Sequence, residues 1–123
     1  METAAVKIDI EEARAYLREK ERMLQQKKRE ELEQTIKKIR DLAHIWEKYN
    51  IKRVYLYGSI PRLRTHRQSD IDIALEGDID YSQLLGLYGE VDKHFSRETD
   101  IRSLEELPFK ATVKEKGVVA YEK

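Results

Sequence analysis

The chain contains no cysteine, and only two prolines and five glycines occur among its 123 residues. Without thiols it can form neither disulfides nor thiolate metal sites. No apolar run approaches the roughly 20 residues that span a bilayer. Near the start, Val6, Ile8 and Ile10 are separated by charged residues, unlike the core of a signal peptide. We therefore expect a cytoplasmic protein without a membrane segment.

The chain also lacks an excess of either charge, since 24 Lys and Arg residues balance 24 Asp and Glu residues. A general electrostatic attraction to nucleic acid is therefore not expected, although a local basic cluster would be compatible with this balance. Charged residues make up 39% of the chain, well above the usual fraction of about a quarter. Much of the chain must then be solvated surface around one modest core.

Residues 9–49 contain neither glycine nor proline and have helical periodicity. Asp9 can cap a helix that has Glu11 and Glu12 in its first turn. The apolar residues recur in helical spacing in two groups: Ala13, Leu17 and Leu24, and then Leu32, Ile36, Ile39, Ala43 and Trp46. We expect one long helix or two consecutive ones, ending at Asn50. The apolar stripe should mainly pack against the core.

The second half of the chain has the shorter period of strands. Three short segments either are rich in β-formers or alternate polar and apolar side chains: residues 53–57, 70–75 and 97–102. We expect each of them to be a strand. Residues 76–78 (EGD) read as a turn that ends the second strand.

Two further helices are expected in this half, over residues 81–95 and from Pro108 to Lys116, where Gly117 would stop the second one. Residues 118–121 would form a short apolar tail. These elements predict an α+β fold, α/β-like, with a small mixed sheet and flanking helices. We expect a helical extension over residues 1–50 and a second unit over residues 51–123.

Asp70 and Asp72 lie two residues apart on an expected strand, so both side chains should share one face. Carboxylates that close repel each other unless a cation or a proton compensates. Mg²⁺ is typically held by one or two carboxylates together with phosphates and water. Asp100 on the third expected strand would add a third carboxylate, with Glu98 and Asp92 as weaker choices. Three such groups could hold two Mg²⁺ or Mn²⁺ ions across a phosphoryl or nucleotidyl transfer.

A second candidate site lies between the first two strands. Gly58 lets the backbone approach a phosphate closely, and Ser59 adds a hydroxyl ahead of a short helix or loop. The following segment is basic and suited to phosphate, with Arg62, Arg64, His66 and Arg67. Each of these signals alone is more often a turn or a solvated surface. The prediction depends on their combination at this spacing.

Gly58-Ser59, ten further residues and then Asp70-x-Asp72 resemble the G-S-x10-D-x-D signature of the DNA polymerase β-like nucleotidyltransferase superfamily. The longer string YGSIPRLRTHRQSDIDIAL resembles the minimal nucleotidyltransferases, which are often paired with HEPN-domain partners in toxin–antitoxin operons. The resemblance covers residues 52–123 and leaves out the helical extension. It implies a nucleotidyltransferase core.

The resemblance also implies roles for individual residues. The nucleotide-binding residues would be Gly58, Ser59 and Arg62, and the metal ligands would be Asp70, Asp72 and Asp100. In related chains the third aspartate also helps to activate the attacking hydroxyl. Members commonly have alanine and glycine where this chain has Pro61 and Leu63, so the turn here departs from the usual pattern.

These observations predict an Mg²⁺-dependent enzyme that transfers a nucleoside monophosphate, AMP from ATP, to a hydroxyl. The acceptor implied by the resemblance is a tyrosine of a HEPN-type toxin. The alternative is a non-catalytic antitoxin that neutralises a HEPN-type protein by contact through its N-terminal helices. Those helices could equally join copies of the chain. Nucleic-acid processing is a weaker hypothesis, because the net charge is zero.

Overall fold

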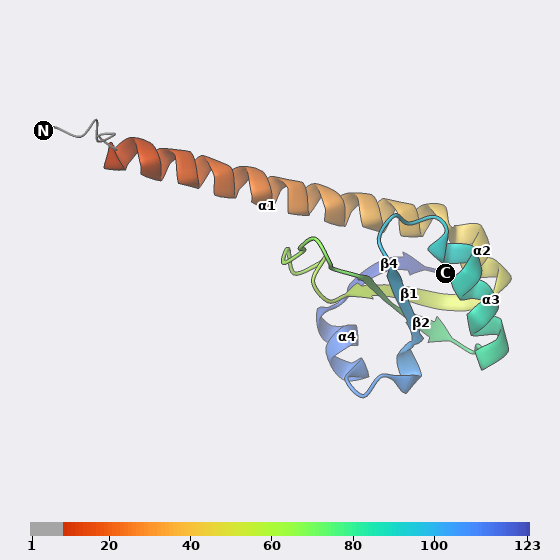
Figure 1. Ribbon diagram of the computed structural model, residues 1–123. Helices are drawn as coiled ribbons and strands as arrows, with labels where there is room; N and C mark the ends of the chain where they lie inside the picture. Colours follow the sequence, from red (N-terminus) through yellow and green to blue (C-terminus); the bar gives the residue numbers. More distant parts are fainter. Residues whose placement is uncertain (1–8) are drawn as a thin grey trace, which may run out of the picture.

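The computed structural model describes residues 9–123, so Val6 and Ile8 lie outside it. The elements follow in the order α1 (Ile10–Asp41), α2 (Ala43–Lys48), β1 (Ile51–Tyr57), β2 (Ile71–Gly77), α3 (Tyr81–Asp92), β3 (Thr99–Ser103), η1 (Leu104–Glu106), α4 (Lys110–Lys116) and β4 (Val118–Glu122). They form a mixed sheet with flanking helices (Figure 1). The α+β prediction is confirmed. Within the described residues no helix has the length and apolar character needed to cross a membrane.

The sheet has four strands in the order β3-β2-β1-β4. β1 is antiparallel to both β2 and β4, whereas β2 and β3 are parallel. The alternation of side chains along the strands divides the core between the two faces. Val54 and Ile73 belong to the larger cluster, under α2, α3 and the end of α1. Tyr55 and Ala74 belong to the smaller one, under η1 and α4.

The N-terminal half forms two consecutive helices, one of the two arrangements expected. The side chain of Asp9 accepts hydrogen bonds from the amides of Glu11 and Glu12, as the capping prediction requires. Leu42 separates α1 from α2. Asn50 has a φ of 56°, which confirms the left-handed conformation expected where the helical segment ends.

Only the last part of α1 packs against the rest of the molecule. Leu32 and Ile36 are partly buried against the core, and Ile39 is fully buried. The expectation that the whole apolar stripe packs inward was wrong for its first group, because Leu17 is 56% exposed and Leu24 is 48% exposed. The physical reason is length. A helix of 32 residues spans about 48 Å, whereas the strands, at up to seven residues, span about 23 Å.

Two segments expected to be irregular belong to the sheet. Glu76 and Gly77 are not a turn but extend β2, where the guanidinium of Arg53 holds the carboxylate of Glu76 at 2.7 Å. The apolar tail is the edge strand β4, which pairs with β1. Its pairing continues to the C-terminus, where the amide of Lys123 donates to the carbonyl of Lys52 at 2.9 Å.

The remaining predicted boundaries were displaced by a few residues. α3 ends at Asp92 rather than at residue 95, and α4 starts at Lys110, after a turn that contains Pro108. The third strand runs from Thr99 to Ser103, a shift of two residues at its start and one at its end. Two candidate residues expected on strands therefore lie just before them: Asp70 before β2 and Glu98 before β3.

Candidate active site

The parallel pairing of β2 with β3 makes Asp72 and Asp100 direct neighbours, since their Cα atoms are partners in the register. Both side chains are half-buried. Asp70 is exposed and lies one residue before β2, not on the strand as expected. The amide of Ile71 donates to the carbonyl of Glu98 at 2.8 Å, which joins the two segments where the ladder begins. The structure thus brings Asp72 and Asp100 together, with Asp70 beside them.

The environment of Asp72 carries uncompensated negative charge. Burial raises the pKa of Asp72 to about 6, and the nearby charges of Asp100 and Asp70 add to the increase. Arg102 acts in the opposite direction, and its Nε donates to a carboxylate oxygen of Asp100 at 3.0 Å. Arg102 and Asp100 lie two residues apart on β3, so they share a face of the strand.

Tyr57 is a site residue that sequence reasoning missed. It ends β1, and its Cα is the register partner of Asp72 across the antiparallel pair. Burial raises the pKa of Tyr57 to about 12, with further increases from the charges of Asp72 and Asp100. The phenol therefore stays protonated near the carboxylates. Its only signal in the sequence is its place directly before Gly58.

The structure shows a reason for glycine at position 58 that the sequence did not suggest. Its φ is 84°, in the region that side chains rarely adopt. A Cβ at this position would lie 2.2 Å from Oδ2 of Asp72, so the missing side chain makes room for that carboxylate. The position of the Asp72 carboxylate therefore depends on the absence of a side chain at the end of β1.

Residues 59–63 form a series of turns, so no helix start is available to present amides to an anion. The amide of Arg64 donates to the carbonyl of Ser59 at 2.9 Å, and the fully buried side chain of Ile60 anchors the segment. Leu63 has a φ of 57°, a left-handed conformation that costs a non-glycine residue about 1–2 kcal/mol. This is the position where the resemblance leads one to expect glycine. The backbone keeps the conformation suited to glycine although the residue differs.

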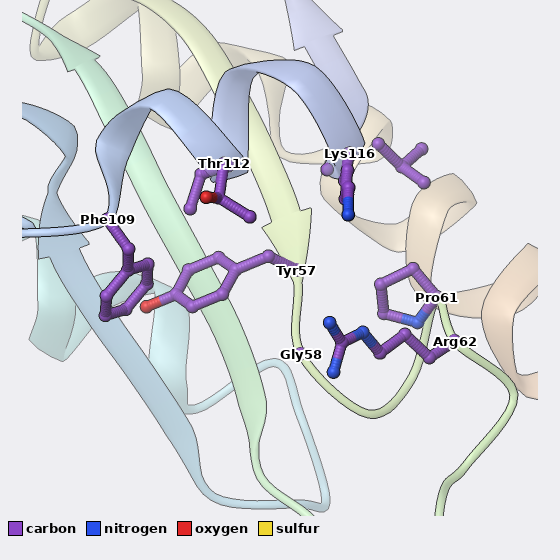
Figure 2. Close-up of a pocket in the computed structure, with 10 residues that line it drawn as sticks. Tyr57, Gly58, Pro61, Arg62, Phe109, Thr112 and Lys116 are labelled. Carbon is purple, nitrogen blue, oxygen red and sulfur yellow. The ribbon is translucent and has the colours of Figure 1, made fainter.

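A pocket of about 400 Å³ opens beside Gly58 (Figure 2). Its apolar side includes Tyr57 and Phe109, whose rings meet edge to face with centroids 5.8 Å apart. Arg62 and Lys116 point into the opposite part of the same pocket. The aspartates are not among the lining residues, and Gly58 lies between them and the pocket.

Lys116 is a second residue that sequence reasoning missed, because its role depends on α4 packing beside the end of β1. Of the four basic residues grouped in the prediction, only Arg62 lines this pocket. Arg67 instead borders a groove of about 370 Å³ that also contains Asp70. Arg64 and His66 are exposed and line neither space.

The loop that leads to Asp70 is held by Arg97. The guanidinium donates to the carbonyls of His66 at 3.0 Å and Ser69 at 3.1 Å. It also meets the carboxylate of Glu31 on α1, at 2.5 Å through Nε. Within the loop, Oγ of Ser69 accepts a hydrogen bond from the amide of His66. One side chain therefore ties the approach to Asp70 to the long helix.

A family model described as polymerase beta, nucleotidyltransferase, matches residues 40–123. The chain belongs to this family. The match begins in the last turn of α1 and covers the whole sheet of this nucleotidyltransferase domain. A comparison with curated proteins finds no significant match.

Two solved structures have a fold similar to that of this chain. One is a crystal structure of a toxin–antitoxin with AMP-PNP, with a TM-score of 0.57 and 21% identity, covering 72% of this chain and 73% of that one. The other is a mutant of the toxin–antitoxin MntA-HpeT, with a TM-score of 0.55 and 18% identity, covering 68% and 71%.

The aspartates of the nucleotidyltransferase domain offer the oxygen ligands that Mg²⁺ prefers. A cation would also compensate the partly buried charge of Asp72, whose pKa is raised by burial and then by the charges of Asp100 and Asp70. Among residues 9–123, however, no three acidic or histidine side chains are already gathered into a complete metal site. The residues thus fit an ion that takes its other ligands from phosphate and water, as Mg²⁺ does.

Proposed function

We propose that the nucleotidyltransferase domain is an active enzyme that transfers AMP from ATP to a hydroxyl group and releases pyrophosphate. The observation that carries the proposal is the placement of Asp72 beside Asp100, with Gly58 separating them from a pocket that contains Arg62 and Lys116. Paired carboxylates next to a cationic pocket suit a metal-bound triphosphate.

Each part of the site has a role in this proposal. Asp72, Asp100 and Asp70 hold two Mg²⁺ ions, for which Mn²⁺ can substitute. When bound, the ions neutralise the negative charge on the reacting phosphate and on the leaving pyrophosphate. Ser59 and Arg62, with the Gly58 backbone, bind the phosphates, and Lys116 adds a second positive charge. The apolar wall formed by Tyr57 and Phe109 accommodates the nucleoside.

The transfer itself exchanges one phosphorus–oxygen bond for another. The oxygen of the acceptor hydroxyl attacks the α-phosphorus of ATP, and the bond from this phosphorus to the bridging oxygen of the β-phosphate breaks. Pyrophosphate leaves with the electron pair. Asp100 accepts the proton of the hydroxyl, which a carboxylate at this position can do while its partner Asp72 stays beside the phosphate.

The acceptor in this proposal is a tyrosine of a HEPN-type toxin. The support is indirect: the two similar structures are described as toxin–antitoxin proteins, and one of them is described with the ATP analogue AMP-PNP. A large acceptor also suits the site, because the carboxylates are only half-buried and can be approached from outside.

The test uses ATP labelled at the α-phosphate, Mg²⁺ and a co-expressed HEPN-type partner. We expect label on the partner with the wild-type chain and at least a hundredfold less with Asp72→Asn. The matched control is Asp78→Asn, which removes an exposed carboxylate in the loop after β2 and should leave the transfer unchanged. Equal labelling by wild type and Asp72→Asn would refute the proposal.

A second candidate function is neutralisation of the partner by contact alone. The exposed part of α1 favours it, because that surface lies outside the family match. Full neutralisation of a co-expressed toxin by Asp72→Asn would establish this alternative. Loss of neutralisation with retained pull-down of the partner would exclude it.

A further inference from the structure

Residues 10–30 of α1, here called the arm, project away from the rest of the molecule (Figure 1). Every side chain of the arm is exposed except Ala13 and Lys28, which are partly covered. Among the described residues, five of the nine exposed large apolar side chains belong to it: Ile10, Tyr16, Leu17, Met23 and Leu24. A solvated helix does not need so many apolar side chains.

The apolar side chains of the arm share one face. At about 100° per residue, they fall within an arc of about 140°. The face is continuous, with Ile10, Leu17 and Leu24 along one side at seven-residue steps and Tyr16 and Met23 along the other. A stripe of this width is typical of a helix that packs against another element.

Among residues 9–123, no other element covers this stripe, whose five apolar side chains are 48–67% exposed. Among the described residues, the first ion pair between α1 and the rest of the domain is that of Glu31, whose carboxylate meets Arg97, and the first buried side chain is Thr35. The family match begins later still, at residue 40, so the arm lies outside the shared catalytic domain. The stripe therefore has no role in holding the nucleotidyltransferase fold together.

The charges within the stripe indicate what can cover it. Lys20 and Lys27 lie at the centre of the apolar arc, where their alkyl stems extend it; once the stripe is covered, their ammonium groups need negative charge beside them. Their neighbour Glu19 is engaged elsewhere, because Arg22 holds its carboxylate at 2.6 Å. The arm as a whole has seven Lys or Arg residues and five Glu residues, so it is basic in a neutral chain.

A second copy of the chain fits the stripe poorly. Two parallel arms in register would place Lys20 against Lys20 and Lys27 against Lys27. Two antiparallel arms that overlap fully would still place Lys20 against its own copy, because residue 20 is the midpoint of residues 10–30. Like charges in facing positions of a helical pair oppose association.

An anionic membrane also fits poorly. Interfacial helices carry their cations on the polar face and leave the apolar face free to enter the lipid. Here two ammonium groups lie at the centre of the apolar face, and the remaining surface includes five glutamates that would face lipid phosphates.

We infer that the arm is a docking surface for an acidic amphipathic helix of another protein. The apolar side of that helix covers Leu17, Leu24 and their neighbours, and its carboxylates pair with Lys20 and Lys27. The inference does not depend on the proposed transfer, because the arm lies outside the site.

The test measures the binding of two synthetic helical peptides to the full-length chain by fluorescence anisotropy. Both peptides have three heptads with leucine at the core positions, and they carry either glutamate or lysine at the flanking positions. We expect the glutamate peptide to bind at least tenfold more tightly than the lysine peptide. Leu17→Ser with Leu24→Ser should weaken its binding at least tenfold.

Reversing the charges of the two lysines tests whether they determine which peptide binds. Lys20→Glu with Lys27→Glu should reverse the preference between the peptides. Arg18→Glu with Arg29→Glu makes the same change of charge on the opposite face of the arm and should leave the order of preference intact. Circular dichroism would verify that all variants keep the helical content of wild type.

Three results would overturn the inference. The first is equal or undetectable binding of both peptides. The second is a dimer of the full-length chain at micromolar concentration that Leu17→Ser abolishes, which would identify a second copy as the occupant. The third is stripe-dependent binding to vesicles of phosphatidylserine and phosphatidylcholine without binding of either peptide.

Discussion

At the scale of single residues, the site is organised around the carboxylate of Asp72. Three elements approach it: the end of β1 through Tyr57, the backbone of Gly58 and the neighbouring strand through Asp100. Each contact restricts the others, because the carboxylate lies where a side chain on Gly58 would otherwise be. Small changes here should therefore affect both stability and the proposed binding of a metal ion.

Gly58→Ala tests the close approach. The new Cβ would meet Asp72 Oδ2 in a backbone conformation that alanine disfavours. We expect a loss of roughly 1–3 kcal/mol in the free energy of unfolding, and Mn²⁺ affinity at least tenfold lower as Asp72 is displaced. Urea denaturation and titration with Mn²⁺ would measure these. Gly89→Ala is the control, since nothing lies near that Cβ. Unchanged Mn²⁺ affinity in Gly58→Ala would contradict this reading.

The raised pKa of Asp72 makes the stability of the metal-free protein depend on pH. Below about pH 4 the group is protonated in both states and has no effect. Between about pH 4 and 6 the unfolded chain releases the proton more readily than the folded one, so stability falls as the pH rises, and the loss is complete above pH 6.

Asp72→Asn removes this penalty. In EDTA at pH 8 we expect the variant to be more stable than wild type, by roughly 1 kcal/mol after allowance for solvent screening of a half-buried group. At pH 4 the difference should nearly vanish. Urea denaturation at the two pH values measures it, and an equal difference at both would show that the carboxylate of Asp72 is not destabilised in the fold.

At the scale of elements, Arg97 connects α1, the loop before β2 and the start of β3. Its guanidinium donates hydrogen bonds to the carbonyls of His66 and Ser69 and forms an ion pair with the carboxylate of Glu31. The position of Asp70 depends on this loop, which has no regular secondary structure of its own.

Arg97→Ala should release the loop. We expect a loss of about 1–3 kcal/mol of stability and at least tenfold faster hydrogen exchange at the amides of residues 66–70. Glu31→Ala should have a smaller effect on exchange, because Arg97 keeps its bonds to the carbonyls. Lys37→Ala is the control, since it removes an ion pair of α1 that is largely exposed. Unchanged exchange in Arg97→Ala would show that the loop is held by other contacts.

The success of sequence-based prediction also differed among the elements. The helices over residues 9–49 and the β2 strand were predicted because their signals are local: capping, periodicity and alternation. β4 was taken for a tail because its pairing with β1 joins residues about 65 positions apart. Lys116 and Tyr57 were missed for the same reason, because contacts between distant residues leave no local signal in the sequence. Their place in the site depends on how α4 and β2 pack at the end of β1. The placement of Asp72 beside Asp100 could be anticipated because it requires only that two expected strands be neighbours.

At the scale of the whole molecule, the chain combines a compact nucleotidyltransferase domain with a projecting arm. The arm contributes no buried core residue, and the first buried side chain of α1 is Thr35. Its removal should therefore leave the domain folded, whereas loss of the end of α1 would remove the buried side chain of Ile39 and the Ile39 carbonyl that accepts a hydrogen bond from Nε1 of Trp46.

A chain that begins at residue 29 tests this division. We expect its thermal midpoint to stay within about 5 °C of that of the full chain, and its AMP transfer to a small hydroxyl acceptor to be unchanged. A chain that begins at residue 40 should be destabilised by several kcal/mol, because it loses the part of α1 that covers the larger core cluster beside α2 and α3. Unfolding of the first truncated chain would show that the arm is part of the fold.

The parallel pairing of β2 and β3 has a consequence for the order of events during synthesis. Parallel neighbours cannot be joined by a hairpin, so α3 must cross over before Asp100 can reach Asp72. The ribosome must therefore have released the chain beyond residue 103 before the carboxylates meet. The arm leaves the ribosome before the domain and needs only local hydrogen bonds to become helical. A helix that binds the arm would thus find its surface on the nascent chain before Asp72 and Asp100 are neighbours.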